Sequence, residues 1–424
     1  MKKADFFCDI SCHTAFIYAD DTFQKKNFYY MINLSKTIRR AAAIFIAGTL
    51  LCGCMMESDF LPDSEYTSSG DYGEEGGNGQ SSSLSGVVTA AEWNDMSNWS
   101  FWGSLMNNPE WVNHAKSWLF YPNKFVYVLT CTSDGKPVAG CEVKLEKDGE
   151  GVWSAISDNS GVAVLWDNLF STDYDSSAEG YSVKVNGADL TTFGFTTLSQ
   201  SEPIVNKFEI ADQGKENAID VAFIVDATGS MSDEIDFLKD DLNEIIEFVG
   251  KQCKADVRTG TVFYRDEGDD YVTKFSEFTD DIDKTVKFIS KQSAGGGGDY
   301  PEAVHTALEA AIQSLDWNGS ARSRIAFLIL DAPPHQTEEV IAICQKTIKA
   351  YAAMGIKLIP VSCSGIDKET EYLFRSFALA TNGTYVFLTN DSGVGGDHIE
   401  ATVGEYKVEK LCDLIARLII AYAK

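Results

Sequence analysis

The sequence predicts an α/β protein: a doubly wound, largely parallel sheet in the second half of the chain, preceded by an all-β sandwich. Two patterns support this prediction. From Ala218 onwards, short runs of β-branched and aromatic residues alternate with longer amphipathic segments, as strands and helices do in a doubly wound sheet. Between Phe125 and Ile210, short apolar runs are separated by Gly and Asp turns, which is typical of sandwich strands.

The composition limits the kinds of partner that we expect. The chain has 424 residues and a formal net charge of −28. So strong a negative charge argues against nucleic acid and anionic membrane surfaces as partners. An aromatic content of 12% argues against a largely disordered chain, so a large folded core is expected.

The N-terminal part carries an export signal. Lys36, Arg39 and Arg40 precede an apolar run, Ala41 to Leu51, that is too short to cross a bilayer. A basic flank followed by a short apolar run is typical of a signal peptide, which we assign to residues 31–53.

The end of this signal, Leu51-Cys52-Gly53-Cys54, resembles a bacterial lipobox, so Cys54 is expected to carry a lipid anchor after cleavage. Ordinary secretion with cleavage nearby and a short uncleaved anchor are the alternatives. The basic flank follows Met31, so we interpret residues 1–30 as an upstream extension without function. A long cytosolic leader is the alternative.

Residues 54–86 are rich in Ser, Gly, Asp and Glu and almost free of aliphatic side chains, so they cannot bury enough surface to fold. We interpret them as a flexible acidic tether. Glu57 and Asp59 resemble the export signals of surface lipoproteins in some Gram-negative bacteria. We therefore expect a lipid-anchored protein of the bacterial outer membrane or cell surface, which touches the membrane through its lipid only. A periplasm-facing position is the alternative.

Residues 87–215 are predicted to hold a Trp-rich segment followed by the β-sandwich domain. We interpret the Trp side chains as packing that covers the neighbouring domain. The turns at Gly135-Lys136-Pro137 and at Asp158 to Gly161 resemble those of carboxypeptidase-regulatory-like and other immunoglobulin-like extracellular modules. The expected strands cover residues 125–129, 141–145, 152–156 and 162–166.

The chain contains 10 Cys, four of them at or before the lipobox. Cys131 and Cys141 flank one predicted hairpin, and an exported context permits a disulfide between them. The other cysteines fall on predicted helices or beside strands and are expected to be buried thiols. The sequence contains no CxxC pair or His/Cys cluster that would indicate zinc.

Residues 216–424 form the predicted doubly wound domain. Its expected strands are 221–225, 257–264, 271–275, 325–330, 357–362 and 385–388. Its expected helices are 232–251, 281–292, 302–315, 338–354, 369–381 and 408–423.

Oxygen-bearing side chains gather where the first of these strands ends. Asp226 closes the apolar run Val221 to Val225, and Thr228 and Ser230 follow it at two-residue spacing. Open α/β sheets bind their ligands at the carboxyl ends of the strands. Because hard oxygen donors suit Mg²⁺, Mn²⁺ or Ca²⁺ and suit Zn²⁺ or Cu²⁺ poorly, we predict a divalent-cation site, with Mg²⁺ as the first choice.

These residues resemble the metal-ion-dependent adhesion site (MIDAS) of von Willebrand factor A-type domains, a Rossmann-like family. Its pattern is D-x-[ST]-G-S, then a second loop, then an Asp after a later strand. Asp226, Thr228 and Ser230 match the first loop, Gly295 to Glu302 (G-G-G-G-D-Y-P-E) lies at the second, and Asp331 matches the third. The resemblance covers roughly the last half of the chain.

The resemblance implies that Asp226, Thr228, Ser230, Asp299 and Asp331 surround the ion and that an Asp or Glu of a protein partner completes its shell. Thr228 replaces the commoner Ser and keeps the hydroxyl. Asp299 stands where many members have a Thr ligand. Its added charge should bind the cation more tightly and weaken the ion's pull on an incoming carboxylate. The alternative is that Asp226 and its neighbours only cap a helix and hold a loop.

The predicted function is that of a lipid-anchored, exported bacterial protein that binds a protein or matrix partner through this metal site. The alternatives are an assembly scaffold for an envelope complex, without metal-dependent adhesion, and an enzyme accessory subunit. The sequence contains no Ser-His-Asp order and no HExxH motif, so we predict no catalytic residues and no enzyme. His335, just past the third loop, is interpreted as a rim histidine that holds a loop.

Overall fold

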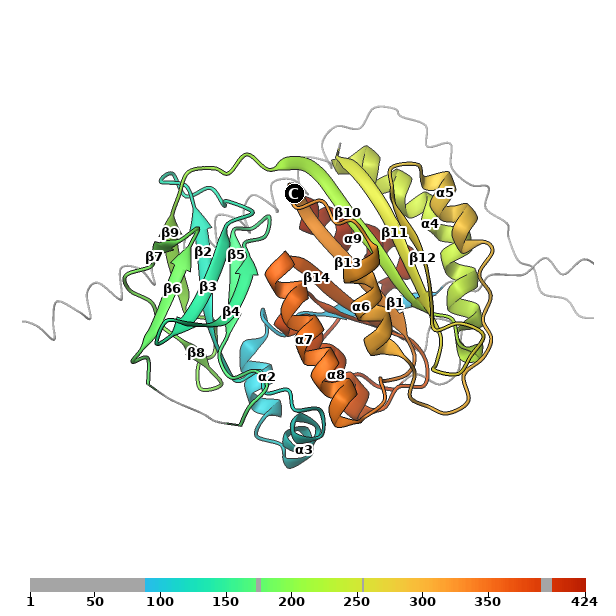
Figure 1. Ribbon diagram of the computed structural model, residues 1–424, viewed down its shortest axis with the longest axis horizontal. Coiled ribbons are helices and arrows are strands. Elements are labelled where there is room, and N and C mark those ends of the chain that lie inside the picture. Colours follow the sequence, from blue (N-terminus) through green and yellow to red (C-terminus); the bar gives the residue numbers. More distant parts are fainter. Residues whose placement is uncertain (1–87, 173–176, 254, 390–398) are drawn as a thin grey trace, which may run out of the picture. The chain divides into compact units, whose positions relative to one another are not determined.

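The computed structural model describes residues 88–424, except 173–176, 254 and 390–398 (Figure 1). The proposed signal peptide, tether and Cys54 therefore lie outside the described residues. Within the described part, no helix is both long enough and apolar enough to cross a membrane.

Three groups of elements follow one another along the chain. The first is β1 (Thr89–Trp93), α2 (Trp99–Leu105) and α3 (Pro109–Trp118). The second consists of strands only: β2 (Lys124–Cys131), β3 (Glu142–Lys147), β4 (Glu150–Ile156), β5 (Val162–Trp166), β6 (Tyr181–Val185), β7 (Ala188–Asp189), β8 (Thr196–Thr197) and β9 (Val205–Glu209). The third alternates strands and helices: β10 (Glu216–Asp226), a 3₁₀ turn (Gly229–Met231), α4 (Ser232–Cys253), β11 (Asp256–Tyr264), β12 (Thr273–Thr279), α5 (Ile282–Ile289), α6 (Val304–Ser314), β13 (Ala321–Leu330), α7 (Glu338–Met354), β14 (Ile356–Ser362), α8 (Lys368–Ala380), β15 (Tyr385–Leu388), β16 (Glu409–Lys410) and α9 (Leu411–Ala423).

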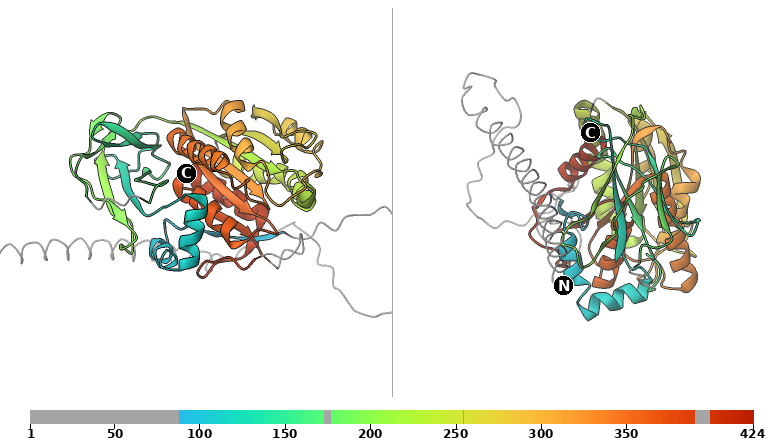
Figure 2. Two further views of the ribbon diagram at one scale, coloured as in Figure 1. Left: turned by 60° about the horizontal axis from the view of Figure 1, so that its bottom comes forward. Right: turned by 90° about the vertical axis from the view of Figure 1, so that its left-hand side faces the viewer.

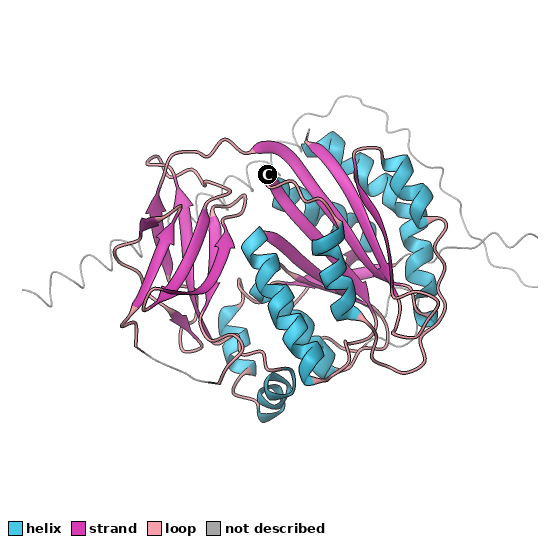
Figure 3. Cartoon of the chain, viewed as in Figure 1, coloured by secondary structure: helices cyan, strands magenta, loops and turns pink. Residues whose placement is uncertain are grey.

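The seven strands of the third group and β1 of the first group build an eight-stranded sheet in the order β12-β11-β10-β13-β14-β15-β1-β16. Strands β10, β11, β13, β14 and β15 run parallel to one another. The antiparallel pairs lie towards the edges of the sheet: β12 pairs with β11, β1 pairs with β15, and β16 pairs with β1. Parallel strands need covered faces, and the helices cover both (Figures 2 and 3). The prediction of an α/β fold with a largely parallel sheet is confirmed.

The central strand β10 shows why this sheet is buried on both sides. Its residues Ile219, Val221 and Phe223 pack in one core with α4, α5 and α9, whereas Ala222 and Ile224 pack in the other with α6, α7 and α8. Successive side chains of a strand point to opposite faces, so a run that is apolar at every position suits only a strand between two helix layers. This burial fixes the position at which β10 ends, and with it the position of Asp226.

The second group forms two four-stranded sheets. One has the order β5-β2-β8 with β9 beside β2, and the other has the order β4-β3-β6-β7. Strands β2 and β3 belong to different sheets, so the expected hairpin between Cys131 and Cys141 is wrong. Both cysteines are buried free thiols rather than partners in a disulfide.

The Trp-rich segment does more than cover its neighbour. Its strand β1 pairs antiparallel with β15 and so extends the eight-stranded sheet. Trp102 stacks on Tyr372 of α8 with ring centroids 5.6 Å apart, and Trp99 meets Phe125 of β2 edge-on at 4.8 Å. The segment therefore packs against both the strand-only group and the α/β group.

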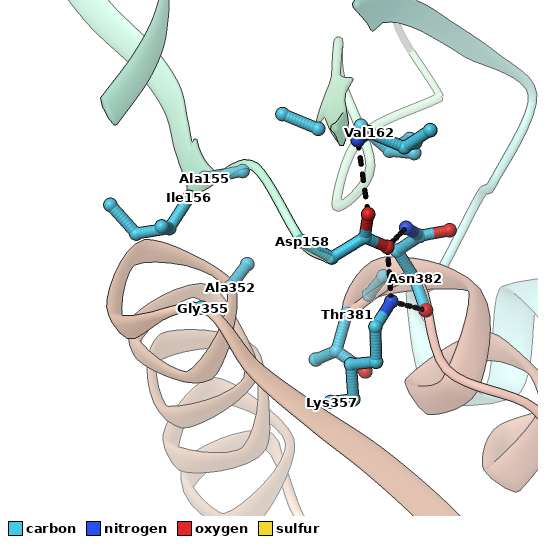
Figure 4. Close-up of a pocket in the computed structure, with 12 residues that line it drawn as sticks. Ala155, Ile156, Asp158, Val162, Ala352, Gly355, Lys357, Thr381 and Asn382 are labelled. Atoms are coloured by element: carbon cyan, nitrogen blue, oxygen red, sulfur yellow. Dashed lines mark hydrogen bonds and ion pairs between the residues drawn. The ribbon is translucent and has the colours of Figure 1, made fainter. Parts of the chain in front are cut away.

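A nearly enclosed ion pair also joins these two groups. Lys357 at the start of β14 lies 2.7 Å from Asp158, which follows β4, and Asn382 donates a hydrogen bond to the same carboxylate at 3.0 Å (Figure 4). Burial is the largest single influence and raises the pKa of Asp158, but the charge and hydrogen bond of Lys357, together with hydrogen bonds from Ser160 and Val162, outweigh it and hold the pKa below its ordinary value. The adjoining cavity measures about 20 Å³, room for about one water molecule.

Candidate metal-binding site

The first site loop begins at the carboxyl end of β10. Asp226 is fully buried, and its Oδ1 accepts hydrogen bonds from the backbone N–H of Thr228 at 2.8 Å and from the Thr228 hydroxyl at 2.7 Å. The hydroxyl oxygens of Thr228 and Ser230 are 3.5 Å apart. The short turn that follows therefore holds one carboxylate and two hydroxyls together before α4 begins.

The third loop brings a second carboxylate to the same place. Asp331 directly follows β13, the neighbour of β10 in the sheet. It is 7% exposed, and the Ser230 hydroxyl donates a hydrogen bond to it. Parallel neighbours end at the same edge of a sheet, which is why residues about 100 positions apart meet here.

Asp331 opens onto a cavity of about 410 Å³. Its lining residues come from the first, second and third loops and from the loop after β14: Ser230, Asp299, Tyr300, Glu302, Asp331, Ala332, Ser364 and Gly365.

The second loop reaches the site because it contains glycines. Gly297 has φ +74°, and a Cβ there would lie 2.9 Å from Oε1 of Glu302 and 3.3 Å from Cβ of Thr228. Gly296 has φ +81°, and its carbonyl accepts a hydrogen bond from the Gly229 N–H at 3.3 Å. Side chains are disfavoured at such positive φ values, so the glycine run lets this backbone lie directly against the first loop.

The structure separates the two acidic residues of the second loop. Asp299, the expected ligand, lines the cavity but is exposed to solvent. Glu302 is only 5% exposed, and its N–H is bonded to the Pro333 carbonyl at 2.9 Å, which ties it to the third loop. We did not assign Glu302 to the site from the sequence. The available signal was its place as the last residue of the G-G-G-G-D-Y-P-E segment, just before α6.

The carboxylates of the site repel one another in a poorly solvated place. Burial, followed by the charge of Asp331, raises the pKa of Asp226 to about 7. Burial also raises the pKa of Asp331. Burial and then the charges of Asp226, Asp266 and Asp331 raise the pKa of Glu302 to about 9. Without a cation, the buried acids are therefore held partly protonated at neutral pH.

Two buried carboxylate oxygens of the site accept no hydrogen bond from the described residues. Asp226 Oδ2 and Glu302 Oε2 have no hydrogen-bond partner among the described residues. Unpartnered buried carboxylate oxygens are costly, and a bound cation would satisfy them. No three His, Cys, Asp or Glu side chains in the described part of the chain are arranged to hold an ion by themselves, so the hydroxyls of Thr228 and Ser230 would have to contribute. This all-oxygen set fits Mg²⁺, Mn²⁺ or Ca²⁺.

Two histidines lie near the site. His335 Nε2 is 2.9 Å from Asp266 Oδ1, as expected for a histidine that holds a loop. His305 is buried on α6, and its Nε2 is 3.6 Å from Oε1 of Glu267. Each ring lies against a carboxylate of the loop that follows β11.

Comparison with known proteins finds a family match in this part of the chain. Residues 220–390 match the von Willebrand factor A domain family. A segment of 117 residues is 33% identical to an ariadne-like RING finger protein of Acanthamoeba polyphaga mimivirus and covers 28% of this chain and 11% of that protein. A segment of 123 residues is 34% identical to the alpha-protein kinase vwkA of Dictyostelium discoideum and covers 28% of this chain and 19% of the kinase.

The match therefore spans less than a fifth of the length of either curated relative. Among solved structures, the conserved hypothetical protein BatB of Bacteroides thetaiotaomicron is similar at 15% identity and a TM-score of 0.34, over 48% of this chain and 98% of that one. Residues 220–390 of this chain therefore match a von Willebrand factor A domain.

Proposed function

We propose that this protein binds a protein or matrix partner at the carboxyl edge of its parallel sheet, with a divalent cation held by Asp226, Thr228, Ser230 and Asp331. The observation that carries the proposal is the unpartnered, fully buried Oδ2 of Asp226, beside a second buried carboxylate and two hydroxyls. Glu302 is added to the donor set because its own Oε2 is buried without a partner among the described residues. Mg²⁺ is the first choice of ion.

The setting that we propose comes from the sequence. The lipobox motif ending at Cys54 and the acidic segment after it support a lipid-anchored, exported protein whose tether holds the folded part away from the membrane. The two four-stranded sheets fit a β-sandwich that acts as a spacer between the tether and the binding domain. The high negative charge favours a protein partner over nucleic acid.

Calorimetric titration of the protein with Mg²⁺, Mn²⁺ and Ca²⁺ tests the metal site. Asp226→Asn removes the buried charge while keeping an acceptor for Thr228, so binding should weaken by at least about a hundredfold. Ser364→Ala is the matched control, because it removes an oxygen from the same cavity outside the proposed donor set. Equal affinities in the wild type and Asp226→Asn would refute the site.

A second experiment tests the link between metal and adhesion. Binding of the protein to whole cells and to matrix proteins is measured with Mg²⁺ and with EDTA. Adhesion through this site predicts that EDTA and Asp226→Asn abolish the same fraction of the binding. Binding that survives both would leave the metal site without a role in adhesion.

A further inference from the structure

The cavity beside the proposed metal site is lined by acidic side chains and, among the described residues, by no basic side chain. Asp299, Glu302 and Asp331 are three of its lining side chains, and no Lys, Arg or His side chain lines it among the described residues. Glu302 is 5% exposed and has one unpartnered carboxylate oxygen, so the cavity contains acceptor capacity that the described part of the chain does not use.

Two basic side chains of the surrounding loops are engaged elsewhere. Arg265, after β11, donates hydrogen bonds to the carbonyls of Ala227 at 3.1 Å and Ser293 at 2.8 Å. Lys368, after β14, lies 2.9 Å from Glu371 and also donates to the Glu400 carbonyl. These two cations are held by the protein's own oxygens and do not line the cavity.

Acidic side chains of the same loops remain exposed. Glu267 and Asp270 follow β11, Glu338 and Glu339 follow β13, and Asp367 follows β14. All three strands end at the edge of the sheet where the cavity opens. A partner that approaches this edge therefore meets negative potential first, which attracts a basic surface and repels an acidic one.

A bound dication does not reverse this potential. Asp226, Asp299 and Asp331 together carry more negative charge than Mg²⁺ carries positive charge, even if Glu302 keeps its proton. An incoming carboxylate would enter a site that is still net negative. The open coordination position of the ion suits a neutral oxygen such as a backbone carbonyl or water, which Mg²⁺ also accepts.

One wall of the cavity suits a cation as well. Tyr300 is 43% exposed, and its hydroxyl donates to the Gly365 carbonyl at 3.3 Å and accepts from the Asp367 N–H at 3.2 Å. These bonds hold the phenol ring at the side of the cavity. An ammonium or guanidinium group over such a ring gains a cation–π attraction in addition to its ion pairs.

We propose that this cavity receives a lysine or arginine side chain of the protein partner, and not the aspartate or glutamate that the MIDAS resemblance implies. The inference rests on the proposed function, because it names the side chain that the metal-dependent surface selects. The exposed carboxylate of Asp299 accepts the hydrogen bonds of the basic group, and the ring of Tyr300 covers it.

The test uses four blocked tripeptides, Gly-Arg-Gly, Gly-Lys-Gly, Gly-Gln-Gly and Gly-Asp-Gly, titrated into the full chain with Mg²⁺ at physiological salt and followed by NMR. We expect the arginine or lysine peptide to bind at least about tenfold more tightly than the aspartate peptide, a typical effect of one charge pair. Asp299→Lys should abolish this preference or reverse it, because Asp299 is exposed and can be replaced without disturbing the core.

Asp256→Lys is the control for net charge. It makes the same change on an exposed residue at the amino end of β11, away from the cavity, and should leave the preference unchanged. A wild-type preference for the aspartate peptide would overturn the inference, as would equal effects of the two lysine substitutions or binding of none of the peptides.

Calorimetry and the peptide titration distinguish a failure of the proposed function from a failure of this inference. If calorimetry detects no divalent cation, the metal-dependent function fails, and the peptide preference is then measured in EDTA to judge the cavity alone. If the cation binds and the aspartate peptide is preferred, the proposed function stands and this inference fails.

Discussion

Replacing Asp226 by Asn should stabilise the cation-free protein at pH 8, although Asp226 is central to the proposed site. The carboxylate is fully buried, and burial raises its pKa to about 7. Its ordinary pKa is 3.8. At pH 8 the group is ionised in both the folded and the unfolded protein. The buried charge therefore lowers the free energy of unfolding.

The sign of the effect follows from proton linkage. The folded pKa is raised, so between about pH 4 and pH 7 the folded state binds more protons than the unfolded state, and stability falls as the pH rises through this window. A shift of about three units corresponds to roughly 4 kcal/mol at pH 8. Relaxation around the charge reduces this value, so we expect a gain of about 2–4 kcal/mol for Asp226→Asn.

The substitution keeps the local hydrogen bonds. The amide oxygen of Asn takes the place of Oδ1 and still accepts from the N–H and the hydroxyl of Thr228. The gain should shrink to about 2 kcal/mol or less at pH 5, where the wild-type carboxyl is largely protonated in the folded state. In saturating Mg²⁺ the wild type alone should gain, by about 2.7 kcal/mol when the free ion reaches a hundred times its dissociation constant.

Urea unfolding in EDTA at pH 8 and at pH 5, followed by tryptophan fluorescence and circular dichroism, measures the difference. Asp299→Asn is the control, because this exposed carboxylate lines the same cavity and its loss should change stability by less than about 0.5 kcal/mol. An Asp226→Asn protein that is no more stable than the wild type in EDTA at pH 8 would refute the account of Asp226 as a buried, uncompensated charge.

Three further predictions concern other parts of the chain. Lys357→Met leaves the Asp158 carboxylate enclosed without its cation and should destabilise the protein by about 3–5 kcal/mol in urea unfolding, with Asp158→Asn added in the double variant restoring part of the loss. Gly297→Ala places a Cβ 2.9 Å from Glu302 Oε1 at φ +74° and should weaken Mg²⁺ binding in calorimetry by about tenfold or more, so an unchanged affinity would contradict the close approach of the second loop. Cys54→Ser should move the protein from the membrane fraction to the soluble fraction and abolish labelling by a fatty-acid analogue, and persistent labelling would contradict the assigned lipid site.

Local signals in the sequence predicted the elements of the α/β half well. The helix expected at residues 338–354 occurs with those bounds as α7. Thr337 caps its first turn, accepting a hydrogen bond from the Val340 N–H at 3.2 Å, and Gly355 ends it at φ +66°. The start signal at Thr337 and the stop signal at Gly355 depend on residue type alone, so both can be recognised without knowing the fold.

Pairing between distant strands could not be predicted in the same way. The short strand β1 joins β15 across about 300 residues, with the hydroxyls of Thr89 and Thr389 2.8 Å apart. An apolar pattern shows that a strand has a buried face but does not name the sheet that provides the neighbour. The same limitation explains the expected hairpin between Cys131 and Cys141, since consecutive strands often pair, but β2 and β3 entered opposite sheets.

The choice between Asp299 and Glu302 depends on backbone geometry that residue types do not encode. Both carboxylates lie in one segment, three positions apart, and either could reach a cation. The path is decided by Gly296 and Gly297, which turn the loop at positive φ, and by the bond from the Glu302 N–H to the third loop. These contacts draw Glu302 inward among Asp226 and Asp331 and leave Asp299 at the mouth of the cavity. The buried carboxylate is thus placed to strengthen the hold on a cation, whereas the exposed one faces whatever enters from outside.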